Sequence, residues 1–280
     1  MKFKLGCQLD YNVVTPTTLF LNIEAQANDH QAIEAQSLSI TPWVSLERYR
    51  APESANIYQR ALLQPGQYTI RYEADVRLSP LMHDPQSVSE VAVSDLPFST
   101  LTYLYPSRYC QSDQLRHFAW REFGGLDRGH QRVTAMCNWI YQNVEYLAGS
   151  SNSETSAFET FSRRAGVCRD FAHLGITLCR ALGIPARFVS AYAWQLEPPD
   201  FHAVFEAYLS GRWYLFDATR QCPLDGIVRI GVGHDAGTTA FSTYYGTIDN
   251  PQQRVWIHPA VAGEEASKDW TTQAISTSAA

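Results

Sequence analysis

Alternating apolar and polar positions dominate the N-terminal part of the chain. Leu19, Leu21 and Ile23 fall on one face of an extended segment, and residues 68–74 repeat this spacing with aromatic and branched side chains. A period of two is typical of strands with one buried face, and such strands need a second layer to cover that face. The pattern therefore predicts an antiparallel β-sandwich over residues 1–80.

The pattern changes after this domain. Residues 81–112 contain Pro85, Pro97 and Pro106 and show little periodicity, so we expect a linker or interface segment there. Helical spacing then alternates with short apolar runs, which predicts a second domain over residues 113–262. The predicted helices are 112–123 with Ser112 as its N-cap, 133–144, 153–164 with Ser153 as its N-cap, and 168–182; the predicted strands are 186–194, 201–209, 213–217 and 227–232.

The C-terminal residues 263–280 are mostly small and polar. Such segments bury too little apolar surface to offset their ordering entropy, so we expect a disordered tail. Together with the helices and strands upstream, this gives an α+β protein of two domains.

Composition agrees with a folded chain. Of 280 residues, 45% are apolar and 18% are charged, and the formal charge is −6 without a long run of Lys or Arg. A basic patch would be needed for nucleic acid or an anionic membrane surface, so we expect neither partner. No apolar stretch reaches the ~18 residues of a membrane span, and the start lacks the pattern of a signal peptide. We therefore expect a cytoplasmic location.

Six cysteines occur in the chain, and none forms a C-x-x-C pair. This spacing argues against a zinc finger and favours reduced thiols, so each cysteine is either a small buried residue or a nucleophile. We expect no metal site. The histidines also lack the spacing of metal ligands.

Cys168 is the candidate nucleophile. It follows Gly166 and starts a helix whose apolar residues recur at helical spacing. The unpaired amides and the positive end of the helix dipole favour a thiolate there, and a backbone N–H at this place can donate to an oxyanion.

His202 and Asp217 are the candidate base and its partner. They lie on two apolar strands that flank the turn Ser210-Gly211, and pairing of Leu209 with Arg212 would place both side chains on one face. A carboxylate that holds an imidazole fixes its tautomer and orientation. Glu206 shares this face and is either a site carboxylate or a solvated charge. Asp170 and His173, close to Cys168, are more easily explained by capping and packing.

The blocks 166–174, 179–187, 201–203 and 213–219 resemble those of bacterial transglutaminase-like proteins. The first hundred residues are similar to the β-rich N-terminal domain of that family. The resemblance implies a papain-like core, with helices packed on an antiparallel sheet and the nucleophile at a helix N-terminus. It further implies a Cys-His-Asp triad of Cys168, His202 and Asp217, which forms a thioester with an amide of a peptide or protein substrate and needs no cofactor.

One feature departs from the resemblance. Animal transglutaminases place a tryptophan upstream of the nucleophile as an oxyanion donor, and residues 149–156 contain none. The second donor is left open, and hydrolysis is as well supported as transfer to an amine. A strict cysteine protease or amidase and a catalytically silent scaffold or peptide-binding module stay as alternatives. The substrate, the role of the N-terminal domain and the oligomeric state are also open.

Overall fold

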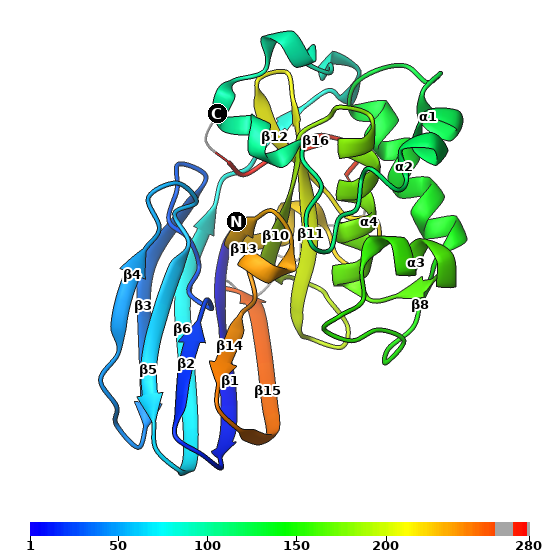
Figure 1. Ribbon diagram of the computed structural model, residues 1–280. Coiled ribbons are helices and arrows are strands. Elements are labelled where there is room, and N and C mark those ends of the chain that lie inside the picture. The colour runs from blue at the N-terminus through cyan, green and yellow to red at the C-terminus, as the bar shows by residue number, and fades with distance from the viewer. Residues whose placement is uncertain (261–270, 279–280) are drawn as a thin grey trace.

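Two layers of antiparallel strands form one half of this computed structural model, which describes residues 1–260 and 271–278 (Figure 1). The sandwich strands are β1 (Lys2–Val13), β2 (Thr17–Leu21), β3 (Gln31–Thr41), β4 (Glu47–Arg50), β5 (Ile57–Leu63), β6 (Gly66–Leu78), β14 (Ser242–Tyr245) and β15 (Ile248–Pro259). One sheet has the order β15-β1-β6-β3 and the other the order β14-β2-β5-β4. The predicted β-sandwich is thus present.

The alternation in the sequence explains which residues lie between these sheets. Leu19 and Leu21 of β2 are buried, and so are Ile70 and Tyr72 of β6, while the intervening side chains face outward. Burying apolar side chains on one face of each sheet is the main driving force for this arrangement.

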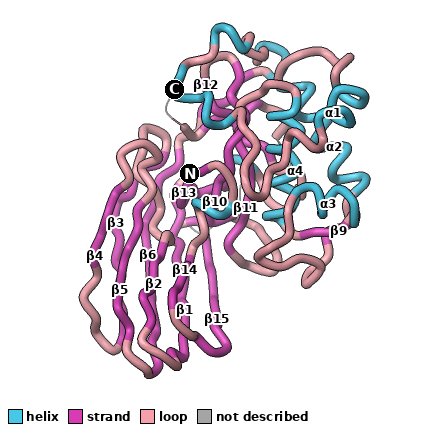
Figure 2. The backbone as a smooth tube through the Cα atoms, in the orientation of Figure 1, coloured by secondary structure: helices cyan, strands magenta, loops and turns pink. Residues whose placement is uncertain are grey.

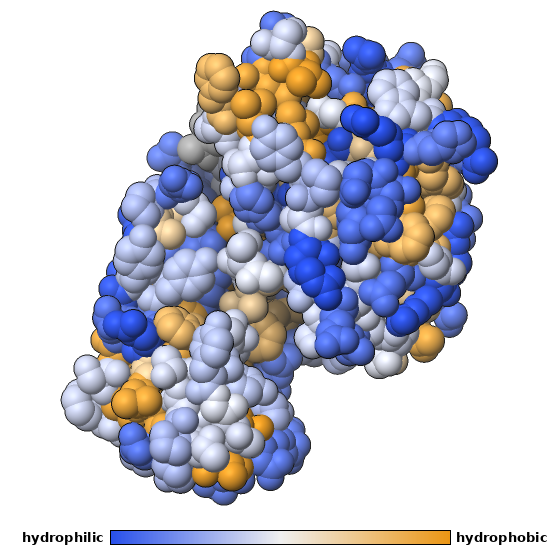
Figure 3. Space-filling model, in the orientation of Figure 1, coloured by the Kyte–Doolittle hydropathy of each residue, from blue (hydrophilic) through white to orange (hydrophobic). Residues whose placement is uncertain are grey.

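A connecting segment leads from the sandwich to the second half of the molecule. It contains β7 (Leu81–His83) and short 3-10 helices at Pro85–Ser87, Val93–Asp95 and Phe98–Tyr103. Figure 3 shows apolar side chains gathered at the top of the molecule, where this segment lies, and Val93 and Phe98 are 57% and 90% exposed.

The second half consists of helices packed on an antiparallel sheet (Figure 2). Its helices are α1 (Arg116–Phe123), α2 (His130–Asn143), α3 (Ala157–Arg163) and α4 (Cys168–Ala181), with 3-10 turns at Leu224–Gly226 and Ala236–Thr238. Its strands are β8 (Glu145–Tyr146), β9 (Ala165–Gly166), β10 (Ala186–Ala193), β11 (Phe201–Leu209), β12 (Arg212–Phe216), β13 (Ile227–Gly233) and β16 (Ala274–Ser276). The main sheet has the order β12-β11-β10-β13, and the buried helix α4 packs against it. None of the described helices is long and apolar enough to span a bilayer.

The two halves interleave, which differs from the expected boundary at residue 262. Strands β14 and β15 come after the core sheet in the sequence but pair with β2 and β1 of the sandwich. The pairing of β15 runs from Pro259 opposite Phe3 to Ile248 opposite Val13. It satisfies the backbone groups along the edge of β1, which a sandwich made only of residues 1–80 would leave unpaired.

The C-terminal segment also differs from the expected disordered tail. Residues 261–270 and 279–280 lie outside the described residues, but β16 pairs antiparallel with β7, and Thr277 and Ser278 are buried. Their hydroxyls accept hydrogen bonds from Arg229 (3.0 Å) and Arg187 (2.7 Å). Small polar side chains are therefore suited to this segment, because buried guanidinium groups need acceptors.

The start of α3 lies three residues later than predicted. Ser156, not Ser153, is the N-cap, and the Glu159 carboxylate accepts a hydrogen bond from the Ser156 backbone N–H at 2.9 Å. The acidic residue in the first turn selects this serine, since it pairs with a backbone donor that the helix itself leaves free.

Strand β13 forms the edge of the core sheet that meets the sandwich. Gln31 of β3 exchanges two hydrogen bonds with the Arg229 backbone, from Nε2 to O and from N to Oε1, both at 2.8 Å. Asn56 does the same with Val232, with both bonds at 2.9 Å. Two side-chain amides thus take the place of a neighbouring strand, so the edge is covered without a continuous sheet.

Candidate active site

Cys168 is the first residue of α4, at the edge of the helical layer. Its side chain is half-buried, whereas the other cysteines are buried, and all six thiols are free. Asp170 fixes the local geometry because its Oδ2 accepts a hydrogen bond from the Val167 N–H at 2.9 Å. Gly166 is needed before this turn, since a Cβ there would lie 2.7 Å from Asp170 Cβ. The thiol therefore sits at a helix N-terminus with one side open.

His202 and Asp217 meet across the hairpin of β11 and β12. Leu209 pairs with Arg212 and Phe205 with Phe216, which is the register predicted from the turn. His202 Nε2 lies 2.9 Å from Asp217 Oδ2. Asp217 lies just beyond β12, and its Oδ1 accepts hydrogen bonds from Thr219 N (2.8 Å) and Oγ1 (2.7 Å). The carboxylate is thus held on both oxygens and presents one to the imidazole.

Charge on this pair is mutually stabilised. Burial disfavours the imidazolium, but the negative charge of Asp217 and the thiol groups of Cys222 and Cys168 raise the pKa of His202 well above its ordinary value. Burial likewise disfavours the Asp217 carboxylate, but the His202 imidazolium and the Thr219 hydrogen bonds hold the pKa of Asp217 below its ordinary range. The arrangement therefore favours an ion pair of imidazolium and carboxylate.

The second ring nitrogen of His202 is left for other chemistry. Nδ1 is buried and has no hydrogen-bond partner among the described residues, and the Cys168 side chain is close enough to contribute to the raised pKa of the imidazole. Since Nε2 is held by Asp217, Nδ1 is the atom that can exchange a proton with the thiol or with a substrate. The three predicted site residues are thus neighbours in space, drawn from α4, β11 and the end of β12.

Cys222 is a further group at this site. Its Sγ lies 3.8 Å from Asp217 Oδ2, and burial raises the pKa of the Cys222 thiol, so it stays protonated and can donate to the carboxylate. His202, Asp217 and Cys222 place ligand atoms within 4.8 Å of one another. These residue types suit Zn²⁺. A bound ion would have to replace the hydrogen bond between His202 and Asp217, so this cluster fits the orienting of a base better than a resident metal.

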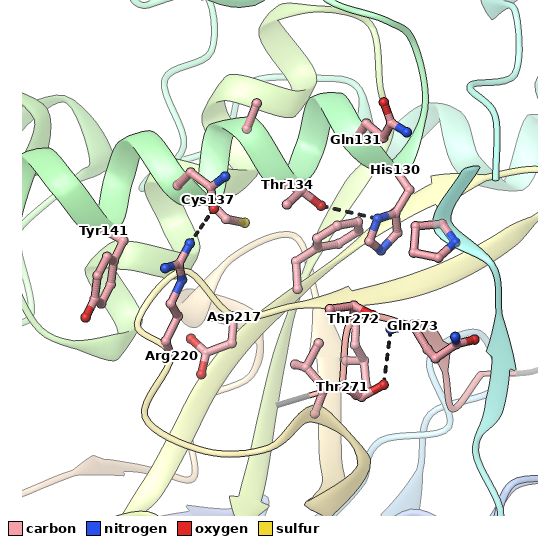
Figure 4. Close-up of a pocket in the computed structure, with 16 residues that line it drawn as sticks. His130, Gln131, Thr134, Cys137, Tyr141, Asp217, Arg220, Thr271, Thr272 and Gln273 are labelled. Carbon is pink, nitrogen blue, oxygen red and sulfur yellow. Dashed lines mark hydrogen bonds between the residues drawn. The ribbon is translucent and has the colours of Figure 1, made fainter. Parts of the chain in front are cut away.

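A pocket of about 670 Å³ opens on the other side of Asp217 (Figure 4). It lies between α2, the end of β12 and residues 271–273, and Arg220 reaches across it to Asn138 and over the Tyr141 ring. Neither Cys168 nor His202 lines it. The exposed side of the Cys168 thiol therefore does not open into this pocket.

Three further residues considered from the sequence have structural partners. Glu206 is fully buried and pairs with Arg187 (2.7 Å) and Arg229, and despite its burial these cations hold the pKa of Glu206 at about 2. It is therefore not a solvated charge, and both of its oxygens are held by guanidinium groups. Asp170 caps α4. His173 stacks on Tyr109 at 5.1 Å, and its Nε2 accepts from the Ala236 N–H at 3.0 Å.

The sequence reasoning missed Thr219, Cys222 and Tyr146 as members of the site. The first two follow Asp217 closely, and the spacing Asp-x-Thr could have indicated a local turn in which Thr219 donates to the carboxylate. Tyr146 is distant in sequence and reaches Cys168 only because β8 pairs with β9. No local sequence pattern predicts the contact between Tyr146 and Cys168.

Two models of protein families match the sequence of this chain. The model of the transglutaminase-like superfamily matches residues 117–218, a range that contains Cys168, His202 and Asp217. The model of the N-terminal domain of bacterial transglutaminase matches residues 1–99. The two ranges lie in the core and in the sandwich respectively.

A crystal structure of a candidate cysteine protease from Cytophaga hutchinsonii is similar over the whole fold. The TM-score is 0.93 at 40% sequence identity, covering 99% of this chain and 97% of that chain. Its helices and antiparallel sheets therefore correspond to those described above, and the expected fold class is confirmed.

Curated relatives align over shorter segments. An uncharacterized protein of Mycobacterium leprae is 30% identical over 115 residues, which is 37% of this chain and 40% of that protein. An uncharacterized protein of Mycobacterium bovis is 42% identical over 60 residues, which is 21% of this chain and 19% of that protein. The chain thus matches less than half the length of these relatives.

Proposed function

Because this chain belongs to the transglutaminase-like superfamily, we propose that it is an enzyme that transfers or hydrolyses acyl groups of peptide or protein amides through a thioester on Cys168. The observation that carries this proposal is the hydrogen bond of 2.9 Å between His202 and Asp217, which leaves Nδ1 of the same imidazole free beside the thiol. The candidate cysteine protease of the same fold supports a peptidase-like activity.

The proposed first step forms the acyl-enzyme. The Cys168 thiolate attacks the amide carbonyl carbon, so that an S–C bond forms and the oxygen becomes an oxyanion. The His202 imidazolium then gives its Nδ1 proton to the leaving nitrogen, the C–N bond breaks and the amine departs. Asp217 stays ionised throughout and keeps the imidazole oriented by its hydrogen bond to Nε2.

The second step discharges the thioester. Neutral His202 takes a proton from water or from a primary amine, the new nucleophile attacks the carbonyl carbon, and the thiolate leaves. Water yields a carboxylic acid, whereas an amine yields a new amide. The half-exposed Cys168 can be reached by either acceptor. A strict protease or amidase differs from a transferase only in using water and not an amine as the acceptor.

Alkylation by iodoacetamide tests the activated thiol. Preferential alkylation of Cys168 would not by itself show an activated thiol, because Cys168 is also the least buried cysteine. The measurement is therefore the rate of Cys168 modification against pH, mapped by mass spectrometry. We expect fast labelling well below pH 8 in the wild type and a loss of at least about tenfold at pH 6.5 in His202→Ala.

His202→Gln is the second variant, and His30→Gln, at a half-exposed histidine just before β3, is the control. His30→Gln should label at the wild-type rate, and circular dichroism of each variant reports whether it has folded. If folded His202→Ala and His202→Gln both label as fast as the wild type at every pH, the pair is not catalytic and a silent scaffold becomes the better description. An acyl-enzyme formed from p-nitrophenyl acetate and then offered a primary amine separates amide from acid as product.

We also propose a cytoplasmic location. Six free thiols support it, since reduced cysteines persist in a reducing compartment.

A further inference from the structure

Tyr146 lies beside Cys168 because two short strands pair. Strands β8 and β9 run parallel with Tyr146 opposite Gly166, and the Leu147 N–H donates to the Gly166 carbonyl at 3.0 Å. The Tyr146 backbone is thereby fixed level with a residue only two positions before the thiol. Its ring packs on Phe171 in the first turn of α4, with 5.7 Å between ring centroids. The tyrosine side chain therefore crosses the N-terminus of the helix that carries Cys168.

The phenol of Tyr146 is close enough to Cys168 for the thiol and the main chain of Cys168 to influence its pKa. Burial and the nearby charge of the Cys168 thiolate raise the pKa of Tyr146 above its ordinary value. The phenol thus keeps its proton at neutral pH and remains a hydrogen-bond donor.

Acyl transfer at this thiol needs such a donor. The tetrahedral intermediate carries an oxyanion, and the Cys168 N–H supplies one hydrogen bond at the start of α4. A single donor stabilises this charge incompletely. Residues 149–156 contain no tryptophan that could supply another.

We infer that the Tyr146 hydroxyl is the second oxyanion donor, acting together with the Cys168 backbone amide; this inference rests on the proposed function. As the substrate carbonyl enters, its oxygen accepts a hydrogen bond from the Cys168 N–H, and the O–H of Tyr146 turns toward the same oxygen. No covalent bond to Tyr146 forms, and its proton stays on the phenol.

The position of the ring suits this movement of the hydroxyl. Its packing on Phe171 and the β8–β9 pairing anchor the side chain at its base, while the residue is 42% exposed. The hydroxyl can therefore shift by a rotation about the side-chain bonds without moving α4. The same position makes a contrary role conceivable, in which the phenol only covers the thiol and slows the reaction.

Two reactions of the same thiol distinguish these roles. Acylation by p-nitrophenyl acetate passes through an oxyanion, whereas alkylation by iodoacetamide does not. In Tyr146→Phe we expect the acylation rate constant to fall by about 10²-fold and the alkylation rate to stay within about twofold of the wild type. Tyr245→Phe, which removes an exposed hydroxyl on β14, should change neither rate.

Each other outcome has a definite meaning. Unchanged or faster acylation in Tyr146→Phe overturns the inference, the faster rate showing that the phenol covers the thiol. An equal loss in both reactions also overturns it, because Tyr146 would then position the thiol and not the oxyanion. If the wild type alkylates rapidly at Cys168 but forms no acyl-enzyme with this ester or with peptide amides, the proposed function fails first.

Discussion

The chemistry at the scale of single residues depends on how Asp217 is held. One oxygen accepts two hydrogen bonds from Thr219, and the other faces His202 and the Cys222 thiol. A carboxylate with all its positions occupied by donors cannot rotate freely, so it fixes the imidazole and stabilises its charge. The raised pKa of His202 is thus a consequence of several neighbours acting through one carboxylate.

Asp217→Asn tests this electrostatic role. The pKa of His202 is raised, so the imidazolium is fully present below its ordinary value and is lost as pH rises through the raised value. Removal of the carboxylate charge moves that loss to lower pH, and the thiolate loses its cation. We expect Cys168 alkylation at pH 6.5 to slow by about tenfold or more. The rate should approach that of the wild type above about pH 9, where thiolate forms without help.

The exposed Asp249→Asn provides the matched control for this charge change. Its Cys168 alkylation rate should equal that of the wild type at every pH. Equal alkylation rates in Asp217→Asn and the wild type at pH 6.5 would remove Asp217 from the proposed mechanism.

The sequence carried enough information to find three of the site residues. Cys168 could be predicted because an apolar helix pattern starts there, and His202 and Asp217 because a glycine turn fixes the hairpin register. Tyr146 could not be predicted, since its contact depends on a two-residue parallel pairing that leaves no periodic pattern in the sequence. Catalytic use of all these residues stays a prediction.

At the scale of elements, one close contact sets the distance between nucleophile and base. Gly175 of α4 faces Phe205 of β11, and a Cβ on Gly175 would lie 2.4 Å from that ring. Cys168 is two helical turns from Gly175, and His202 lies three residues from Phe205 on the same strand. The missing side chain therefore lets the helix approach the strand that carries the imidazole.

Gly175→Ala should accordingly separate Cys168 from His202. We expect a loss of stability of about 1–3 kcal/mol from overpacking, measured by urea unfolding. We also expect slower Cys168 alkylation at pH 6.5 in the protein that remains folded. Gly125→Ala is the control, because a Cβ there meets nothing within 4 Å. Normal stability and normal alkylation in Gly175→Ala would show that the helix position tolerates a methyl group.

At the scale of the whole molecule, the amides of Gln31 and Asn56 join the sandwich to the core sheet. Each pairs with both backbone groups of one β13 residue, and all four side-chain and main-chain partners are buried. Sequence reasoning could not predict this contact, because the residues that meet are more than 170 positions apart and neither amide belongs to a motif.

Gln31→Ala and Asn56→Ala should each destabilise both halves together. In Asn56→Ala the Val232 N–H and carbonyl both lose their partners, and in Gln31→Ala the Arg229 N–H does, while the Arg229 carbonyl keeps the Gln26 N–H. Each unsatisfied buried group costs about 1–3 kcal/mol. The midpoint temperature of thermal unfolding should fall, and unfolding should remain one transition when it is followed by Trp fluorescence and by circular dichroism. The exposed Gln64→Ala should leave it unchanged. Coincident curves that match the wild type would mean that water replaces the amides at no cost.

The return of β15 to the edge of β1 has a consequence for how this architecture can be exchanged between proteins. The chain leaves the sandwich after β6, re-enters it at β14 and, after β15, contributes β16 to the core half, so it passes between the halves three times. A graft of the core from a relative must therefore carry both the segment between β6 and β14 and the C-terminal β16, and leave β14 and β15 to the host sandwich. A simple fusion at one junction after β6 would separate β15 from β1 and leave that edge of the sandwich unpaired.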